Sequence, residues 1–196
     1  VVSYGFNHQY MHNALQLNRG IAVEDVPLFS NTARMSKVAL TDWSWAPLFA
    51  DLDNDGWKDV FVTNGSKRDV NNKDYFTNIS KQVLLGSLKE VNVEDIPSEP
   101  IENMAFRNNR NLTFTPMGAE WGLHYKGFSN GVAYADLDND GDLDMVVAVD
   151  DEIIIRENTS PGFGTAMVLS VGTIVTSLEL ADLDGDGVED ISFTSG

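Results

Sequence analysis

Three short acidic segments with the same internal spacing constrain this 196-residue chain more than any other feature. They read DLDNDGWKD at 51–59, DLDNDGDLD at 136–144 and DLDGDGVED at 182–190. In each segment acids stand at positions 1, 3, 5 and 9, and glycine stands at position 6. Carboxylates this close repel one another, so folding them together costs free energy unless a cation lies between them. The repeated pattern indicates cation-binding loops, and the alternative is a solvated acidic turn without an ion.

We predict that each loop binds one Ca²⁺ ion through its carboxylates and one main-chain carbonyl at position 7. The glycine at position 6 allows the positive φ that such a tight turn needs. Oxygen ligands suit Ca²⁺ better than zinc or copper, and Mg²⁺ is the second choice because it keeps more water. The predicted ligands are Asp51, Asp53, Asp55, Trp57 and Asp59 in the first loop, Asp136, Asp138, Asp140, Asp142 and Asp144 in the second, and Asp182, Asp184, Asp186, Val188 and Asp190 in the third.

The loops differ from an EF-hand in two respects. An EF-hand loop needs glutamate at position 12 and a helix after it. Position 12 is Val62, Val147 and Phe193 in the three loops, and β-branched runs such as DVFVTNG follow them. The sequence therefore predicts calcium loops that lie inside β-hairpins.

The charge of the chain agrees with cation binding and argues against other partners. The formal net charge is -17, and the three loops hold 14 of the 30 acidic residues, four in the first and five in each of the others. One divalent ion per loop would add six charges and leave about -11. Nucleic acid and anionic membrane surfaces need basic patches, so neither is an expected partner. The absence of cysteine excludes disulfides and cysteine zinc sites. No apolar run is long enough to insert into a membrane.

A larger unit repeats around the loops. Apolar segments at 43–50, 129–135 and 173–181 precede them, and β-branched runs follow them. Segments that fit a third strand of each repeating unit lie at 13–20, 103–114 and 152–160, and a further strand follows each of them. Four strands per unit, with the loop between strands one and two, predict an all-β fold of propeller-type blades.

The predicted boundaries are a half-blade at 1–40, a blade at 41–118, a blade at 119–172 and a half-blade at 173–196. The first blade carries an insertion at 66–100, in which helical spacing predicts one amphipathic helix at about 73–91 that packs on the propeller. These strands amount to about three blades, whereas closed propellers have about four to eight. We therefore expect an incomplete ring, which is either part of a longer propeller or is completed by another copy.

The blocks FADLDNDGWKDVFVTNG and YADLDNDGDLD resemble FG-GAP/VCBS repeats, the calcium-bearing blades of integrin α-chain heads and of many bacterial exported proteins. With NALQLNR, NMAFRNN and LTFTPMGAEWGL they resemble most the bacterial branch related to cartilage acidic protein, over residues 9–157. Residues 161–196 resemble only a generic blade, and IAVEDVPLFS lacks the usual N-G-x-F turn. The resemblance implies a seven- or eight-bladed propeller, calcium in the loops and a location that is extracellular, on the bacterial cell surface or periplasmic.

We predict a non-enzymatic, calcium-binding scaffold for adhesion or for binding a protein or carbohydrate ligand. A self-assembling surface or fibre subunit is one alternative, and a polysaccharide-degrading propeller enzyme is another. The sequence contains no G-x-S-x-G, H-E-x-x-H or phosphate-binding loop motif. Four tryptophans could stack on sugars, but packing roles are expected for Trp43, Trp45 and Trp121 from their places at strands and a blade corner.

Overall fold

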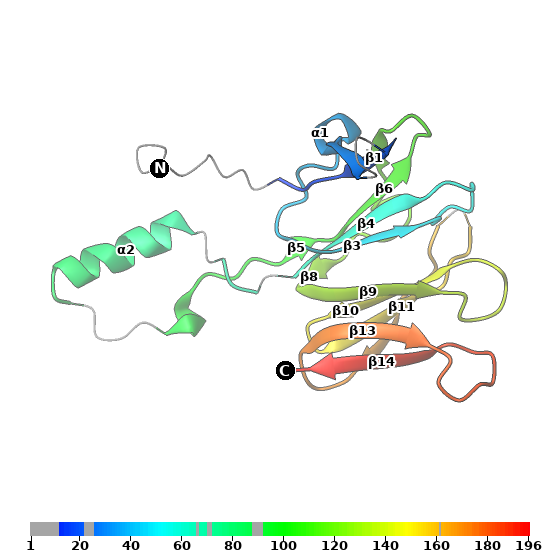
Figure 1. The fold of residues 1–196 in the computed structure, drawn as a ribbon. Helices are drawn as coiled ribbons and strands as arrows, with labels where there is room; N and C mark the ends of the chain where they lie inside the picture. The colour runs from blue at the N-terminus through cyan, green and yellow to red at the C-terminus, as the bar shows by residue number, and fades with distance from the viewer. Residues whose placement is uncertain (1–11, 22–25, 66, 70–71, 88–91, 161) are drawn as a thin grey trace.

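The computed structural model describes residues 12–21, 26–65, 67–69, 72–87, 92–160 and 162–196. Most of the elements are antiparallel strands, grouped into sheets that stack face to face from the first half-blade to the last (Figure 1). The described strands do not close a ring. The prediction of propeller-type four-stranded blades in an incomplete ring is confirmed.

The first complete sheet has the strand order β3-β4-β6-β7. Its strands are Ser44–Ala50, Asp59–Asn64, Met104–Asn108 and Phe114–Pro116. All six residues of β4 are buried, as expected for an apolar central strand that is covered on both faces. Pro47 lies in β3, at the edge of the sheet, where its missing N–H breaks no ladder.

The second sheet repeats this order as β9-β10-β11-β12. Its strands are Ser129–Ala135, Asp144–Val149, Glu152–Arg156 and Met167–Ser170. The run DMVVAV forms β10 and is buried throughout, so its lack of apolar alternation marks a strand between two layers. The short turn between β10 and β11 contrasts with the long insertion between β4 and β6.

A two-stranded sheet lies at each end of the stack. One consists of β1 (Gln16–Ile21) and β2 (Pro27–Asn31), and the other of β13 (Val175–Ala181) and β14 (Asp190–Ser195). Part of the predicted half-blade 1–40 lies outside the described residues. Helix α1 (Ala33–Ser36) follows β2, and this short helix was not predicted from the sequence.

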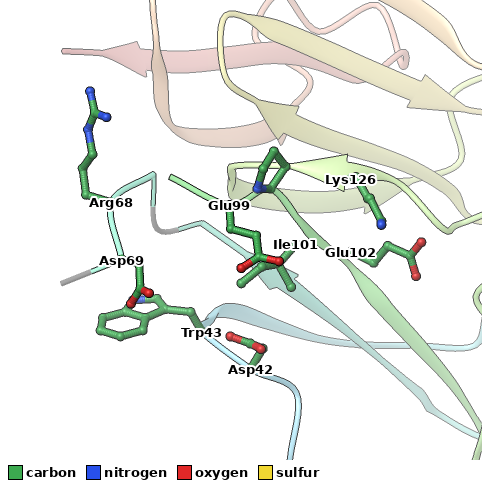
Figure 2. A pocket seen from close by; sticks show the side chains of 9 residues that line it. Asp42, Trp43, Arg68, Asp69, Glu99, Ile101, Glu102 and Lys126 are labelled. Atoms are coloured by element: carbon green, nitrogen blue, oxygen red, sulfur yellow. The ribbon is translucent and has the colours of Figure 1, made fainter. Parts of the chain in front are cut away.

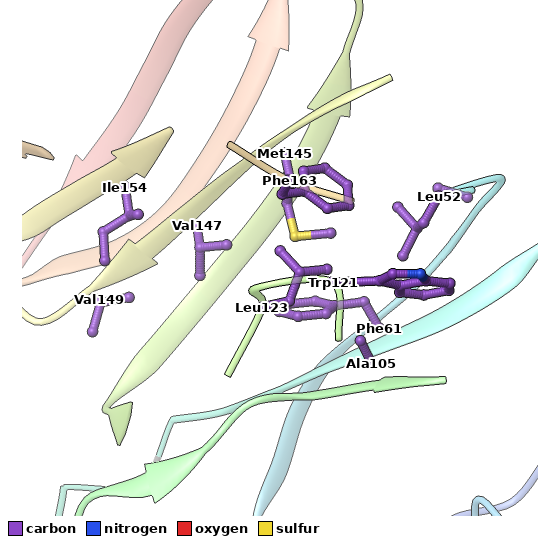
Figure 3. Packing of buried hydrophobic residues seen from close by; sticks show 11 residues of the cluster. Leu52, Phe61, Ala105, Trp121, Leu123, Met145, Val147, Val149, Ile154 and Phe163 are labelled. Carbon is purple, nitrogen blue, oxygen red and sulfur yellow. The ribbon is translucent and has the colours of Figure 1, made fainter. Parts of the chain in front are cut away.

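Apolar clusters lie between successive layers and join them. The central cluster fills the space between the two complete sheets and includes Trp121, Phe61, Met145 and Leu52, the last of these from the first acidic loop (Figure 3). A second cluster joins the first sheet to residues 33–39, and a third joins the second sheet to β13 and β14. Trp121 has the predicted packing role, whereas Trp45 is 57% exposed, so a core role for Trp45 is wrong.

The insertion between β4 and β6 differs from its prediction. Helix α2 spans Lys73–Leu84 and begins at Asn72, whose side chain accepts a hydrogen bond from the Tyr75 N–H. The helix ends before the predicted residue 91, because Gly86 takes a left-handed conformation with φ of 64°. Residues 88–91 lie outside the described residues, and a short 3₁₀ helix, η3, follows at Val93–Asp95.

The predicted packing of this helix on the blades is wrong. No residue of α2 is buried, and the helix stands away from the sheets (Figure 1). The insertion is joined to the blades through a small sheet that the sequence did not indicate, in which β5 (Ile101–Glu102) pairs with β8 (Lys126–Gly127). No helix among the described residues is both long and apolar enough to cross a membrane.

Candidate metal centres

Each acidic loop joins the first two strands of its sheet. The loops follow β3, β9 and β13, and the strand pairs that carry them close at Ala50–Asp59, Ala135–Asp144 and Ala181–Asp190. The equivalent register places position 9 of every loop as the first residue of the second strand. The three loops therefore have one common geometry at the same end of the stacked sheets (Figure 1).

Two residues of each loop adopt a left-handed backbone conformation. The predicted glycine at position 6 has φ of 85°, 97° and 88° at Gly56, Gly141 and Gly187. Position 4 is also left-handed, a feature that the sequence analysis missed although the residue types signal it. Asparagine and glycine are the residues that tolerate this conformation best, and the positions are Asn54, Asn139 and Gly185.

The structure brings together the carboxylates of positions 1, 3 and 9. In each loop one oxygen atom from each of these three side chains lies within 4.8 Å of the other two. The three groups are Asp51, Asp53 and Asp59, then Asp136, Asp138 and Asp144, and then Asp182, Asp184 and Asp190. Each group could hold a metal ion with hard oxygen ligands.

The carboxylate at position 1 also organises its own loop. Asp51 accepts the N–H of Asp55 at 3.0 Å through Oδ1 and the N–H of Gly56 at 2.8 Å through Oδ2. Asp136 accepts the corresponding N–H groups of Asp140 and Gly141 at 3.1 and 3.0 Å. These bonds hold the loop in a closed turn that gathers its carboxylates.

In the first two loops the carboxylate at position 9 ties the loop to the end of the third strand of its blade or to the residues just after it. Asp59 accepts the N–H of Leu52 at 2.9 Å and the N–H of Asn108 at 2.8 Å, one at each carboxylate oxygen. Asp144 accepts the N–H of Leu137 and the N–H of Asn158, both at 2.8 Å. Burial raises the pKa of Asp59 to about 6 and also raises the pKa of Asp144.

Asn108 and Asn158 are site residues that the sequence analysis did not identify. The Asn108 amide donates to the carbonyl of Lys58 at 2.9 Å. The buried Asn158 amide donates to the carbonyl of Leu143 at 3.3 Å and also to that of Leu52 in the first loop at 3.2 Å. Asn158 therefore links the first two loops across the interface between their blades.

Positions 5 and 7 do not belong to the close carboxylate groups, and their role as ligands stays a prediction. The carboxylates of Asp55, Asp140 and Asp186 are not among the three close groups, and each accepts the N–H of the residue at position 7 in its own loop. Coordination by the carbonyls of Trp57, Asp142 and Val188 stays a prediction. In the first loop, Asp55 also accepts a hydrogen bond from Arg110, which lowers the pKa of the Asp55 carboxyl.

One atom of the first loop fits a cation directly. Oδ1 of Asp53 is buried and has no hydrogen-bond partner. Burial raises the pKa of this carboxyl, and the carboxylates of Asp55 and Asp51 raise it further. A buried oxygen without a donor costs free energy, and an ion between Asp51, Asp53 and Asp59 would satisfy it. The oxygen-only donor set agrees with Ca²⁺.

A pocket of about 470 Å³ lies at the opposite ends of the strands from the loops (Figure 2). Trp43, which precedes β3, forms one wall, and Asp69 and Glu99 contribute from the two ends of the insertion. Glu102 and Lys126 also line the pocket, and they are cross-strand partners in the β5–β8 sheet. Trp43 is thus half-buried against a cavity rather than in a core.

Comparison with known families agrees with the blade geometry. Residues 136–192 match the FG-GAP-like repeat family. FG-GAP repeats form propeller blades, and the matched residues include the second and third acidic loops with the strands between them. No curated protein matches the chain. The segment from Asp136 to Ser192 is therefore an FG-GAP-like repeat.

Proposed function

We propose that the three acidic loops bind Ca²⁺ and that the ions hold the inner hairpins of the blades together. The observation that carries this proposal is the grouping of three carboxylates within 4.8 Å in every loop, including the orphaned Asp53 oxygen. Ion binding would compensate the repulsion within each group and the burial of Asp59. We further propose that the chain belongs to the bacterial branch related to cartilage acidic protein and acts outside the cytoplasm.

Thermal unfolding with and without Ca²⁺ tests the ion-binding part of this proposal. Ligands that bind only the folded state raise its stability by mass action, by about 2.7 kcal/mol at a ligand concentration 100 times the dissociation constant. We expect a clear rise in melting temperature with Ca²⁺, a smaller rise with Mg²⁺, and reversal by a chelator. Calorimetric titration should give about three ions per chain. No shift with Ca²⁺, Mg²⁺ or Mn²⁺ would contradict the proposal.

We propose that the chain as a whole acts as a non-enzymatic scaffold that binds a protein or carbohydrate ligand. The pocket beside Trp43 supports this role, because it combines a tryptophan face with hydrogen-bond acceptors and donors. Arg68 orders the pocket wall by donating to the carbonyls of Glu94 and Ile96 at 3.1 and 3.2 Å. Ligand sites of this kind take their specificity from a few fixed polar groups beside an apolar surface.

Binding measurements on a Trp43→Ala variant test the role of this pocket. Neutral oligosaccharides and peptides would be titrated in saturating Ca²⁺, with Trp57→Ala as the control because Trp57 lies in an acidic loop at the other end. We expect Trp43→Ala alone to abolish binding of whichever class binds the wild type. Equal loss in both variants would contradict a role for the pocket.

The side chains on one face of the last hairpin, β13–β14, favour a scaffold over a self-assembling subunit. Leu48 and Phe61 of the first blade pack toward the second blade, and the equivalent register positions in β13 and β14 are Glu179 and Ser192. A second copy that used this hairpin to complete the first half-blade would turn this polar face toward the apolar side of β3, where Trp45 and Phe49 are exposed. Such a contact would bury Glu179 against apolar side chains. We therefore expect a monomeric mass in solution.

A further inference from the structure

We infer that Arg110 lowers the calcium affinity of the first acidic loop, and that the second loop lacks this restraint because Ser160 stands at the equivalent position. The inference rests on the proposed function, since it requires the loops to bind Ca²⁺. It assigns different affinities to loops that have the same acid spacing.

Arg110 places a positive charge on one of the predicted ligands of the first loop. Its Nη2 atom donates to Oδ2 of Asp55 at 2.8 Å and lies 3.4 Å from the main-chain oxygen of the same residue. The other carboxylate oxygen, Oδ1, accepts the N–H of Trp57 at 2.9 Å. A divalent ion that recruits Asp55 must therefore displace or share the guanidinium, and it also meets the repulsion of that charge.

The second blade provides an internal comparison. The N–H groups of Arg110 and Ser160 donate to Oδ1 of Asn108 and Asn158 at 2.8 and 3.1 Å. Both asparagines in turn donate their N–H to the position 9 aspartate of their own loop. Arg110 and Ser160 are therefore equivalent in the fold, but serine carries no charge.

No cation of the described residues forms an ion pair with the position 5 carboxylate of the second or third loop. Within the described residues, ion pairs join Arg110 to Asp55 and Lys67 to Asp150. Within the described residues, the carboxylates of Asp140 and Asp186 each accept the N–H of position 7. Among the described residues, the position 5 carboxylate is therefore paired with a cation in the first loop but not in the second or third.

The turn that carries Arg110 is held by bonds that do not involve its guanidinium. The Asn109 N–H donates to the carbonyl of Thr113 at 3.0 Å, and the Ser36 hydroxyl donates to the carbonyl of Leu112 at 2.6 Å. The Arg110 side chain is 55% exposed. An incoming ion can therefore release the guanidinium into water without rearranging the backbone. The free energy lost with the Arg110–Asp55 bond then lowers the affinity for the ion and does not destabilise the turn.

Terbium luminescence gives a readout that is specific for the first loop. Trp57 occupies position 7 of that loop, whereas Asp142 and Val188 occupy it in the others, so Trp57 should sensitise Tb³⁺ bound in the first loop. A Trp57→Phe variant identifies the share of emission that comes from Trp57. Displacement of Tb³⁺ by Ca²⁺ then reports the affinity of this loop, and calorimetric titration reports all three.

We expect Arg110→Gln to raise the Ca²⁺ affinity of the first loop about three- to tenfold, because it removes both a competing bond and a nearby charge. Arg107→Gln is the matched control. Arg107 directly precedes Asn108 and forms no ion pair with the loop within the described residues. Its charge acts on Asp53 and Asp55 without a hydrogen bond to either, so the same charge change should raise affinity only about twofold or less. Ser160→Arg should weaken the second loop by a similar factor and leave the first unchanged.

Two results would overturn the inference and leave the proposed function intact. One is Ca²⁺ binding to the loops with an unchanged or weaker first site in Arg110→Gln. The other is an equal gain in Arg110→Gln and Arg107→Gln, which would show only a general charge effect. Absence of Ca²⁺ and Tb³⁺ binding in the wild type and all variants would instead overturn the proposed function itself.

Discussion

The first and third acidic loops share one spacing but lie in different surroundings. Asp59 is fully buried and bonded to the third strand of its blade, whereas within the described residues Asp190 is exposed and accepts the N–H of Leu183 in its own loop. Leu52 in the first loop is 1% exposed and packs in the central cluster, but Leu183 at the same position is 69% exposed. The motif determines how the carboxylates are gathered. The neighbouring strands determine how strongly those carboxylates are desolvated.

Removing the position 9 carboxylate should give the largest difference in stability loss between the two loops. In Asp59→Ala the N–H groups of Leu52 and Asn108 lose their acceptor, and each buried unsatisfied group costs about 1–3 kcal/mol. We expect a loss of about 3 kcal/mol in the free energy of unfolding. Asp190→Ala, at an exposed position, should cost about 0.5 kcal/mol or less in chelator. Urea titrations in chelator check this, and equal losses would refute the contrast in burial.

The asparagine that links two loops should matter more than its counterpart in the first blade. Asn158 is fully buried and bonds to both Leu52 and Leu143, whereas Asn108 is partly exposed and bonds to Lys58. Asn158→Ala should cost about 2 kcal/mol and Asn108→Ala about 1 kcal/mol. Urea midpoints at constant slope give both values. A larger loss in Asn108→Ala would mean that the link between the blades contributes little.

The burial of Asp59 should also give the ion-free protein a distinctive pH dependence. The pKa of Asp59 is about 6 in the folded chain against 3.8 for an unperturbed aspartate, so the folded chain binds the proton more tightly. Its contribution to stability is complete below the unfolded pKa and is lost as pH rises through about 6. On the proposed function, Ca²⁺ would bind the deprotonated form, so the stabilisation by Ca²⁺ should grow over the same range.

Melting temperatures from pH 4 to pH 8 in chelator, for wild type and Asp59→Asn, isolate this contribution. The wild type should lose stability relative to the variant as the pH rises through 6. A difference that stays constant with pH would show that Asp59 does not titrate in this range.

The smallest expected effect concerns the backbone at position 4. Gly185 has φ of 81°, and asparagine occupies the equivalent left-handed positions 54 and 139 in the other loops. Gly185→Asn should therefore change the free energy of unfolding by about 0.5 kcal/mol or less. Gly187→Ala, at φ of 88°, should cost about 1 kcal/mol because alanine is strained there. Thermal denaturation of the two variants tests this ranking, and a costlier Gly185→Asn would contradict it.

The sequence predicted the features that depend on short-range spacing. Strand positions around the loops follow from apolar runs and turn residues, and the buried run in β10 was recognised because it lacks alternation. The three close carboxylates of each loop also lie within nine residues of one another. These features need no knowledge of distant segments.

The features that the sequence did not predict depend on distant segments or on available surface. Asn158 and Leu52 are 106 residues apart, and no local sequence pattern indicates the hydrogen bond between them. The guanidinium of Arg110 reaches Asp55 across 55 residues. Helical spacing identified α2, but periodicity cannot show whether a neighbouring surface exists to cover its apolar side.

The local origin of the ligands bears on the order in which the molecule assembles. Each carboxylate group comes from nine consecutive residues, and closing so short a segment costs little chain entropy. An ion can therefore bind a hairpin before the contacts between blades have formed. Calcium should then raise the refolding rate as well as slow unfolding, which stopped-flow measurements can separate. On this route the hairpins form first around their ions, and the distant bonds of Asn108 and Asn158 follow as the blades close on one another.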